Sequence, residues 1–240
     1  MTDGPVPLRD AFASPQTRRR HVRDLFSTIA DRYDLITVLL SFGLDRTWKE
    51  RVVRLGHPHA GERALDLACG TGDIAFRLAD MGAQVTGLDV THRMLELARA
   101  KPASSSPAFL QGDMMALPFA SDCFDLVTAG YGLRNVAELV PAIDEIRRVL
   151  KPGGRFVSLD FNRPSNPLVR GIDLSYLAGV GSALGWTLHR DPDTYRYIPE
   201  SIKRYPGAPM VAKIMRDRGF REARSVSVLG GLMAIHVAVR

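Results

Sequence analysis

The chain has 240 residues, 45% of them hydrophobic and 24% charged, which is the composition of a globular protein with one large core rather than of a disordered chain. No stretch of about 18 apolar residues occurs, so a membrane-spanning helix is not expected. The two cysteines, Cys69 and Cys123, favour a reducing cytoplasm over a disulfide framework, and the histidines show no ligand spacing, so no metal site is expected.

The first part of the chain predicts a tail followed by a helical cap. Residues 1–20 lack the apolar segment of a secretory signal and are expected to form a flexible tail that runs into three arginines. Apolar residues at helical spacing predict a helix over 21–30, and helical patterns continue over 35–42 and 47–55. This helical cap, residues 21–60, precedes the first strand and is expected to cover the ligand-binding edge of a sheet.

Strands and helices alternate through the rest of the chain. Short apolar runs predict strands at 63–67, 84–88, 108–111, 124–128 and 155–159. Helical patterns lie at 74–81, 93–100, 139–150 and 210–218. Two last apolar runs, 224–229 and 232–239, meet at Gly230-Gly231 and predict a hairpin. The expected fold is α/β, a mostly parallel seven-stranded sheet with helices on both faces and a C-terminal antiparallel hairpin, over residues 61–240 with an insertion at about 162–208.

A glycine turn follows the first strand and predicts a nucleotide-binding site. Gly70 and Gly72 let the backbone pass close to a ligand, and Asp89 at the end of the next strand can hold two ribose hydroxyls. Asp66, just before the turn, would meet the pyrophosphate of a dinucleotide as a like charge. It suits S-adenosylmethionine (SAM), which carries a sulfonium and an α-amino group and no phosphate. A parallel sheet that finishes in a hairpin is also typical of Rossmann-like SAM methyltransferases, whereas a nicotinamide-dependent oxidoreductase normally adds a sixth parallel strand.

Several segments resemble the UbiE/MenG/Coq5 family, the C-methyltransferases of ubiquinone and menaquinone biosynthesis. They include Phe-Ser-Thr-Ile-Ala-Asp-Arg-Tyr-Asp at 26–34, Gly-Leu-Arg-Asn-Val at 132–136 and Tyr-Arg-Tyr-Ile-Pro-Glu-Ser at 195–201. The resemblance covers about residues 21–238. It implies a class I methyltransferase that uses SAM, with S-adenosylhomocysteine as product, to C-methylate a prenylated demethyl-quinol. The quinol would be of the demethylmenaquinol or 2-polyprenyl-6-methoxy-1,4-benzoquinol type.

The resemblance also assigns the cofactor site. Asp113 would accept the adenine amino group, Met114 would lie against the adenine face, and Tyr33 and Lys49 would reach the carboxylate side of SAM. The backbone at Thr71 would approach the methionine moiety. The full expected set of cofactor-binding residues is Tyr33, Lys49, Asp66, Gly70, Thr71, Gly72, Asp89, Asp113, Met114 and Gly130.

Methylation of a quinol carbon needs electron density on the ring, and a hydroxyl whose pKa is near the tyrosine value of about 10 is mostly protonated at neutral pH. Arg134, past the fourth strand, is expected to stabilise the phenolate, the alternative being a solvated loop arginine. Asn135 would orient the same oxygen. Asp160, after the fifth strand, is expected either to accept the proton or to be a structural carboxylate.

Partners follow from the insertion and the net charge of +6. Tyr195 and Tyr197 are expected to line the acceptor pocket or to belong to the core. The apolar run 174–186 is either a lipid-facing mouth or a buried helix. The positive charge favours an anionic lipid surface over nucleic acid, because no aromatic and basic residues interleave. The expectation is a cytoplasmic protein, peripheral at the inner membrane surface, with a homodimer left open.

Rival functions remain at this point. Thr37, Asp113 and Asp160 depart from the family's usual residues, which keeps a methyltransferase of another small aromatic metabolite open. A nicotinamide-dependent oxidoreductase is disfavoured by Asp66 and by the terminal hairpin. A non-catalytic subunit with the SAM-binding fold is disfavoured because Asp66, Gly70, Asp89 and Arg134 are all present.

Overall fold

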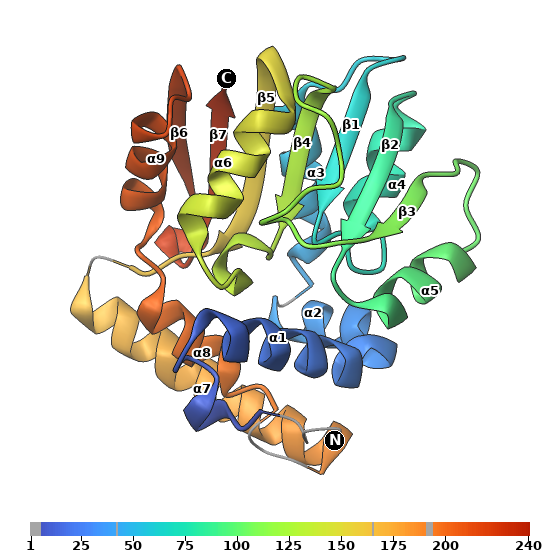
Figure 1. Cartoon of the computed structure of the whole chain (residues 1–240). Helices are drawn as coiled ribbons and strands as arrows, with labels where there is room; N and C mark the ends of the chain where they lie inside the picture. Colours follow the sequence, from blue (N-terminus) through green and yellow to red (C-terminus); the bar gives the residue numbers. More distant parts are fainter. Residues whose placement is uncertain (1–5, 42, 165, 191–193) are drawn as a thin grey trace.

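The computed structural model describes residues 6–41, 43–164, 166–190 and 194–240, which form a seven-stranded sheet flanked by helices (Figure 1). The strand order is β3-β2-β1-β4-β5-β7-β6. The first five strands are parallel, and β7 runs antiparallel to both β5 and β6. The strands are β1 Arg63–Leu67, β2 Gln84–Asp89, β3 Ala108–Gln111, β4 Phe124–Gly130, β5 Leu150–Phe161, β6 Glu222–Val228 and β7 Met233–Val239. The predicted fold class, with its C-terminal antiparallel hairpin, is confirmed.

Helices cover both faces of the sheet because its central strands are apolar on both sides. Along β1, Ala64 packs with α3 and α4, whereas Leu65 and Leu67 pack with α6 and α9 on the opposite face. These helices are α3 Asp45–Gly56, α4 Asp73–Asp80, α6 Leu139–Val149 and α9 Ala208–Asp217, and α5 is His92–Ala100. No helix in the described part of the chain has the length and apolar character needed to cross a membrane.

A second group of helices lies beyond the carboxyl ends of β1, β2 and β4 (Figure 1). It consists of α1 Pro15–Ile29, α2 Tyr33–Leu40, α7 Pro167–His189 and α8 Tyr197–Arg204. The N-terminal cap and the 162–208 insertion therefore meet at one edge of the sheet. Ligands of parallel sheets bind at this edge, because the loops that follow the strands converge there.

The start of α1 differs from the expectation. The helix begins at Pro15 rather than at residue 21, so residues 15–20, which were expected to form part of the tail, are helical. Ser14 caps it, because its Oγ accepts the Thr17 N–H at 3.1 Å while Thr17 Oγ1 accepts the Ser14 N–H at 3.0 Å. Leu8–Asp10 form a short 3-10 turn. Residues 1–5 of the expected tail lie outside the described residues.

The apolar run 174–186 lies inside α7, and neither of the two alternatives describes it fully. One face of the helix is buried and carries Asp173, Leu177, Gly181 and Gly185. The opposite face exposes Leu168, Ile172 and Trp186, with relative exposures of 72%, 64% and 65%. A Cβ on Gly181 would lie 3.1 Å from Tyr195 Cβ, so the glycine allows close packing of the chain after α7. The helix is therefore amphipathic, with one face toward the site and one toward solvent.

Candidate active site

A cavity of about 740 Å³ lies at the carboxyl edge of β1, β2 and β4. Its size is that of a small-molecule site. Its lining includes seven of the residues predicted to bind the cofactor or to act on the acceptor: Tyr33, Gly70, Asp89, Asp113, Met114, Gly130 and Asn135. Three residues of α1 close it from the cap side: Arg19, Val22 and Phe26.

Asp89 fixes the glycine turn. Its Oδ2 accepts the Gly70 N–H at 2.9 Å, and its Oδ1 accepts the Thr91 N–H at 2.8 Å. Burial raises the pKa of this carboxyl, and the two backbone N–H groups partly offset that rise. Because Asp89 also lines the cavity, its remaining lone pairs can accept hydroxyl groups, as the ribose role requires.

The predicted adenine end holds one residue that sequence reasoning missed. Asp113 Oδ1 accepts the Met115 N–H at 2.9 Å, and Oδ2 forms an ion pair with Arg19 of α1. Met114 lies beside it and is 8% exposed. Arg19 was expected to belong to the tail, yet the early start of α1 brings it over the cavity. A capping box at residues 14–17 was the available signal.

A smaller adjoining cavity of about 300 Å³ is lined by Tyr33, Lys49, Asp66, Gly70 and Thr71, among others. Asp66 is 1% exposed and accepts the Thr128 hydroxyl at 2.7 Å. Burial raises the pKa of Asp66 to about 7. A cation placed here would favour the ionised carboxylate, so the cavity suits the positive end of a ligand.

Lys49 and Thr71 tie the cap to this smaller cavity. Lys49 Nζ forms ion pairs with Asp45 at 2.6 Å and with Asp73 at 2.8 Å. The Thr71 hydroxyl donates to Asp34 of α2 at 2.6 Å. Both side chains therefore hold α2 and α3 against the glycine turn, while they also line the cavity.

Gly72 forms the turn that begins α4. It lines neither of the two cavities above. Its φ of 86° lies in the left-handed region, and a Cβ would come within 2.9 Å of the Phe76 ring. Gly72 is therefore needed for the turn that begins α4, and its contact with the cofactor stays a prediction.

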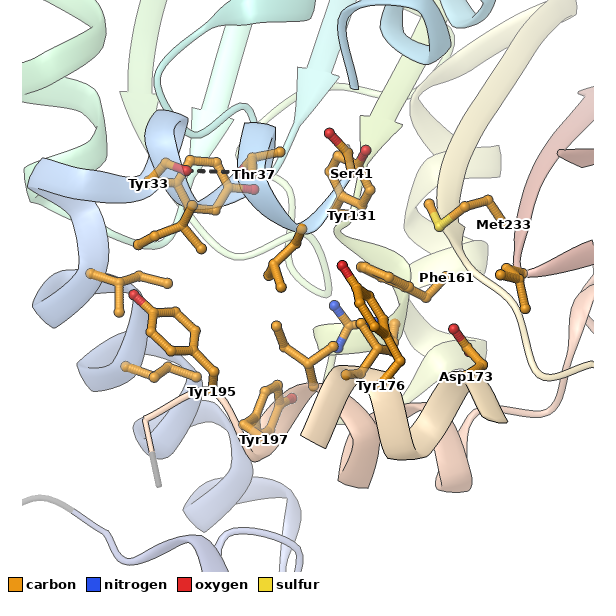
Figure 2. Close-up of a pocket in the computed structure, with 18 of the residues that line it drawn as sticks. Tyr33, Thr37, Ser41, Tyr131, Phe161, Asp173, Tyr176, Tyr195, Tyr197 and Met233 are labelled. Carbon is orange, nitrogen blue, oxygen red and sulfur yellow. Dashed lines mark hydrogen bonds between the residues drawn. The ribbon is translucent and has the colours of Figure 1, made fainter. Parts of the chain in front are cut away.

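A third cavity, of about 920 Å³, lies between the cap helices and the ends of β4 and β5 (Figure 2). Its lining is mostly apolar and aromatic, and Tyr33 and Tyr131 line both this cavity and the 740 Å³ cavity. The two cavities therefore meet at these two tyrosines and at Phe26, which also lines both. We call the third cavity the acceptor cavity, for the role proposed for it below; Tyr195 and Tyr197 line it, and both are only 1% exposed.

Arg134 lines the acceptor cavity and is held rigidly. It follows β4 in a short 3-10 turn and is 3% exposed. Its Nε donates to Asp160 Oδ1 at 3.2 Å, and Nη1 donates to the Ser201 hydroxyl. The guanidinium also lies 5.2 Å from the centre of the Phe161 ring. The alternative of a solvated loop arginine is therefore wrong.

Asp160 has the geometry of a structural carboxylate. It is 1% exposed, and its two oxygens accept the Arg134 N–H at 2.9 Å, the Arg134 Nε–H and the Phe161 N–H at 2.8 Å. It lines neither the acceptor cavity nor the 740 Å³ cavity. Two of its three contacts position Arg134 and the third is to the Phe161 N–H, which favours the alternative of a structural carboxylate over the proton acceptor.

Asn135 also differs from the expectation. Its Nδ2 donates to the Tyr131 carbonyl at 2.8 Å, and it lines the 740 Å³ cavity rather than the acceptor cavity. Its Oδ1 is buried with no hydrogen-bond partner among the described residues. A ligand in that cavity would satisfy this oxygen with an N–H or O–H donor.

The residues present fit SAM. Two buried carboxylates, Asp66 and Asp89, and the unpartnered Asn135 Oδ1 offer acceptors for amino and hydroxyl groups. The lysine in the smaller cavity, Lys49, is paired with two acids, Asp45 and Asp73, which offset its positive charge. This donor set suits a cationic nucleoside and disfavours a dinucleotide.

Known proteins resemble this chain along nearly its whole length. The ubiE/COQ5 methyltransferase family matches residues 14–240. The curated "Ubiquinone/menaquinone biosynthesis C-methyltransferase UbiE" of Zymomonas mobilis is 40% identical over 226 residues, which cover 93% of each chain. The "Demethylmenaquinone methyltransferase" of Clavibacter sepedonicus is 39% identical over 221 residues, which cover 91% of this chain and 90% of that protein.

Solved structures of lower sequence identity share the fold. A SAM-dependent methyltransferase of Thermotoga maritima has a TM-score of 0.67 at 18% identity and covers 91% of this chain and 99% of its own. A Haemonchus contortus N-methyltransferase, solved with phosphomonomethylethanolamine and S-adenosylhomocysteine, has a TM-score of 0.66 at 15% identity, over 91% of this chain and 60% of that one. These likenesses concern the fold alone. The family match over residues 14–240 gives the identity: the chain belongs to the ubiE/COQ5 methyltransferase family and is a SAM-dependent methyltransferase.

Proposed function

We propose that this methyltransferase methylates a ring carbon of a prenylated demethyl-quinol in respiratory quinone biosynthesis. The observation that carries the proposal is the acceptor cavity, which is apolar and aromatic, meets the cofactor cavity at Tyr33 and Tyr131, and presents the rigid guanidinium of Arg134. The names of the curated relatives point to the same reaction, since they refer to ubiquinone and menaquinone biosynthesis. The acceptor is either a demethylmenaquinol or a 2-polyprenyl-6-methoxy-1,4-benzoquinol.

The chain's own residues would supply orientation and charge. Bound SAM brings an electrophilic methyl group on a sulfonium. Tyr33 and Tyr131 flank the place where the two cavities meet, so they would align the acceptor carbon with that methyl group and exclude water. Arg134 would stabilise the phenolate oxygen of the acceptor, because a buried guanidinium favours the ionised form of a nearby hydroxyl.

The cofactor roles are part of the same proposal. Asp89 would hold the ribose hydroxyls, Asp113 would accept from the adenine amino group, and Asp66 would face the cationic end of SAM. Tyr33 and Lys49 would border its carboxylate. The helices α1 to α3 would act as a cap, since α1 supplies Arg19, Val22 and Phe26 to the cofactor cavity.

We also propose that the protein works at a membrane surface. Two of the helices that line the acceptor cavity, α2 and α7, expose apolar side chains on their outer faces: Leu35, Val38, Leu39, Leu168, Ile172 and Trp186. A prenylated quinol resides in lipid, so an apolar rim beside the cavity would let it enter without crossing water. A homodimer that buries this rim is the competing explanation, and light scattering with and without vesicles separates the two.

The function is tested by complementation of bacterial mutants that lack quinone C-methylation. Cells that carry the wild-type chain are expected to restore methylated quinones, measured by mass spectrometry of extracted lipids. Cells that carry Arg134→Ala are expected to accumulate the demethyl form. Unchanged quinone pools with a well-expressed wild-type chain would support methylation of another small aromatic metabolite instead. A thermal shift with SAM but not with NADH separates the methyltransferase from an oxidoreductase.

A further inference from the structure

Asp173 is a buried acid in the acceptor cavity that has no place in the mechanism above. It lies on the buried face of α7, one turn before Leu177, and is 7% exposed. Figure 2 shows it at the wall of the cavity, which Tyr176, Phe161 and Met233 also line. The described residues that line this cavity include two with formal charges, Asp173 and Arg134.

The Asp173 carboxylate differs from the other buried acids of the site because one of its oxygens is buried without a hydrogen-bond partner among the described residues. Its Oδ2 is buried and receives no hydrogen bond from the described residues. By contrast, Asp66 accepts from Thr128, Asp89 accepts from two backbone N–H groups, and Asp160 is paired with Arg134. Burial raises the pKa of Asp173 to about 6.

An unpartnered buried carboxylate destabilises a fold, because its lost hydration is not replaced by hydrogen bonds. We therefore expect a bound ligand to supply the hydrogen-bond donor that this carboxylate lacks. The missing partner must be a hydrogen-bond donor that enters the acceptor cavity. A ring hydroxyl of the proposed quinol is a donor of this kind, and it must lose its proton for the ring carbon to become nucleophilic.

We propose that Asp173 is the catalytic proton acceptor of this enzyme and takes the proton from a ring hydroxyl of the acceptor. This inference rests on the proposed function and deepens it. It also replaces Asp160, which accepts three hydrogen bonds from Arg134 and Phe161 and does not line the acceptor cavity. Asp173 then removes the proton from the ring hydroxyl, and Arg134 stabilises the negative charge left on the hydroxyl oxygen.

The step balances. The hydroxyl O–H bond breaks, its proton goes to Asp173, and its electron pair enters the ring. The ring carbon ortho to that oxygen forms a bond to the methyl group as the methyl–sulfur bond breaks, with that bond's electron pair staying on sulfur. The ring C–H proton then leaves to solvent, its electron pair restores the aromatic ring, and the phenolate regains a proton from Asp173. One proton is released for each methyl group transferred.

The first test measures binding and needs no turnover. The probe is 1,4-dihydroxynaphthalene, held reduced under nitrogen, compared with its dimethyl ether, which cannot donate a hydrogen bond. The wild-type chain is expected to prefer the dihydroxy compound by about tenfold to hundredfold, the range of a hydrogen bond to a charged group. Asp173→Asn is expected to lose most of this preference. Asp217→Asn, an exposed carboxylate on α9, is the matched control and should keep it.

The second test measures turnover. Asp173→Asn is expected to lower kcat by about 100-fold to 10,000-fold, as removal of a general base does, with SAM affinity and melting temperature near those of wild type. Quinols with more acidic hydroxyls, such as ring-halogenated ones, should recover part of the loss, because they need the base less. Asp173→Leu is a second variant, used if Asp173→Asn fails to fold. It removes the buried polar group altogether and should lose turnover in the same way.

Three outcomes distinguish a failure of the Asp173 proposal from a failure of the proposed quinol methylation. Wild-type turnover in Asp173→Asn overturns the role of Asp173. So does a loss of turnover that is equal for all acceptors and leaves the hydroxyl preference unchanged, because that pattern indicates a structural role. If the wild-type chain methylates no quinol at all, the proposed function fails, and the binding comparison still shows whether Asp173 recognises a ring hydroxyl.

Discussion

Arg134 and Asp160 form an ion pair that is almost completely shielded from solvent, with side-chain exposures of 4% and 1%. Two contacts join them, from the Arg134 N–H at 2.9 Å and from Nε at 3.2 Å. Arg134 follows β4 and Asp160 lies near the end of β5, and these are neighbouring strands. The sheet itself therefore fixes the guanidinium at the wall of the acceptor cavity.

Breaking this pair should destabilise the fold. In Asp160→Ala the buried guanidinium loses its counter-charge, so we expect the free energy of unfolding to fall by about 3–5 kcal/mol. Urea denaturation measures it. Asp144→Ala, which removes an exposed acid paired with Arg218, is the control and should cost about 1 kcal/mol or less. Similar losses in the two variants would contradict the burial argument.

Arg134 should matter for turnover and not for the cofactor. It lines the acceptor cavity and is absent from the lining of the cofactor cavity. We therefore expect Arg134→Ala to bind SAM as wild type does, by calorimetry, and to lose about 100-fold to 1,000-fold in kcat, as removal of one stabilising donor does. A matching loss of SAM affinity would show that the arginine acts on the cofactor.

Asp89 should be needed for SAM binding itself. The variant Asp89→Ala would lose the ribose contacts and also release the Gly70 N–H that the carboxylate now holds. Two hydrogen bonds to a charged group correspond to a loss of about 100-fold or more in affinity. Equilibrium binding of SAM measures this, with Asp80→Ala, an exposed acid on α4, as the control. An Asp89→Ala affinity within threefold of wild type would exclude the ribose role.

Asp66 should couple SAM binding to proton release. Its pKa of about 7 in the free protein lies above the ordinary value near 3.9, so at pH 6.5 the carboxyl is mostly protonated. A bound cation favours the ionised form, which lowers the pKa and expels most of one proton. Above pH 8 the group is already ionised, so the release should vanish there.

Calorimetric titrations of SAM in two buffers of different ionisation enthalpy detect this proton. The apparent binding enthalpy should differ between the buffers at pH 6.5 and agree at pH 8.5. Asp66→Asn should remove the difference at the lower pH. Equal enthalpies for the wild-type chain at pH 6.5 would mean that no cation approaches Asp66.

The sheet was predictable because buried parallel strands appear in the sequence as apolar runs between turn residues. β1 and β3 have the bounds that the sequence predicts, and β5 runs longer at both ends. The glycine turn and Asp89 were also predictable, since the ligand chemistry fixes their order along the chain. Strand ends in β4 and β6 shift by about two residues, because pairing with neighbouring strands decides where a strand stops.

The acceptor side was less predictable, because burial there depends on contacts between distant segments. Asp160 and Asp173 each look like isolated acids in the sequence, yet one is paired with Arg134 and the other is not. The three arginines before residue 21 carry no apolar helical pattern, so the predicted start of α1 was too late. The capping residue Ser14, which precedes them, marks the true start. Arg19 reaches the cofactor cavity only because that helix starts early.

Transfer of a labelled methyl group identifies the atom that the enzyme methylates. The purified chain is incubated with SAM labelled at its methyl carbon, and with reduced demethylmenaquinol or its benzoquinol counterpart in lipid vesicles. We expect a quinone whose label lies on a ring carbon, detected by mass spectrometry and NMR, and none from Arg134→Ala. Label on an oxygen atom, or no labelled quinone from either acceptor, would contradict it.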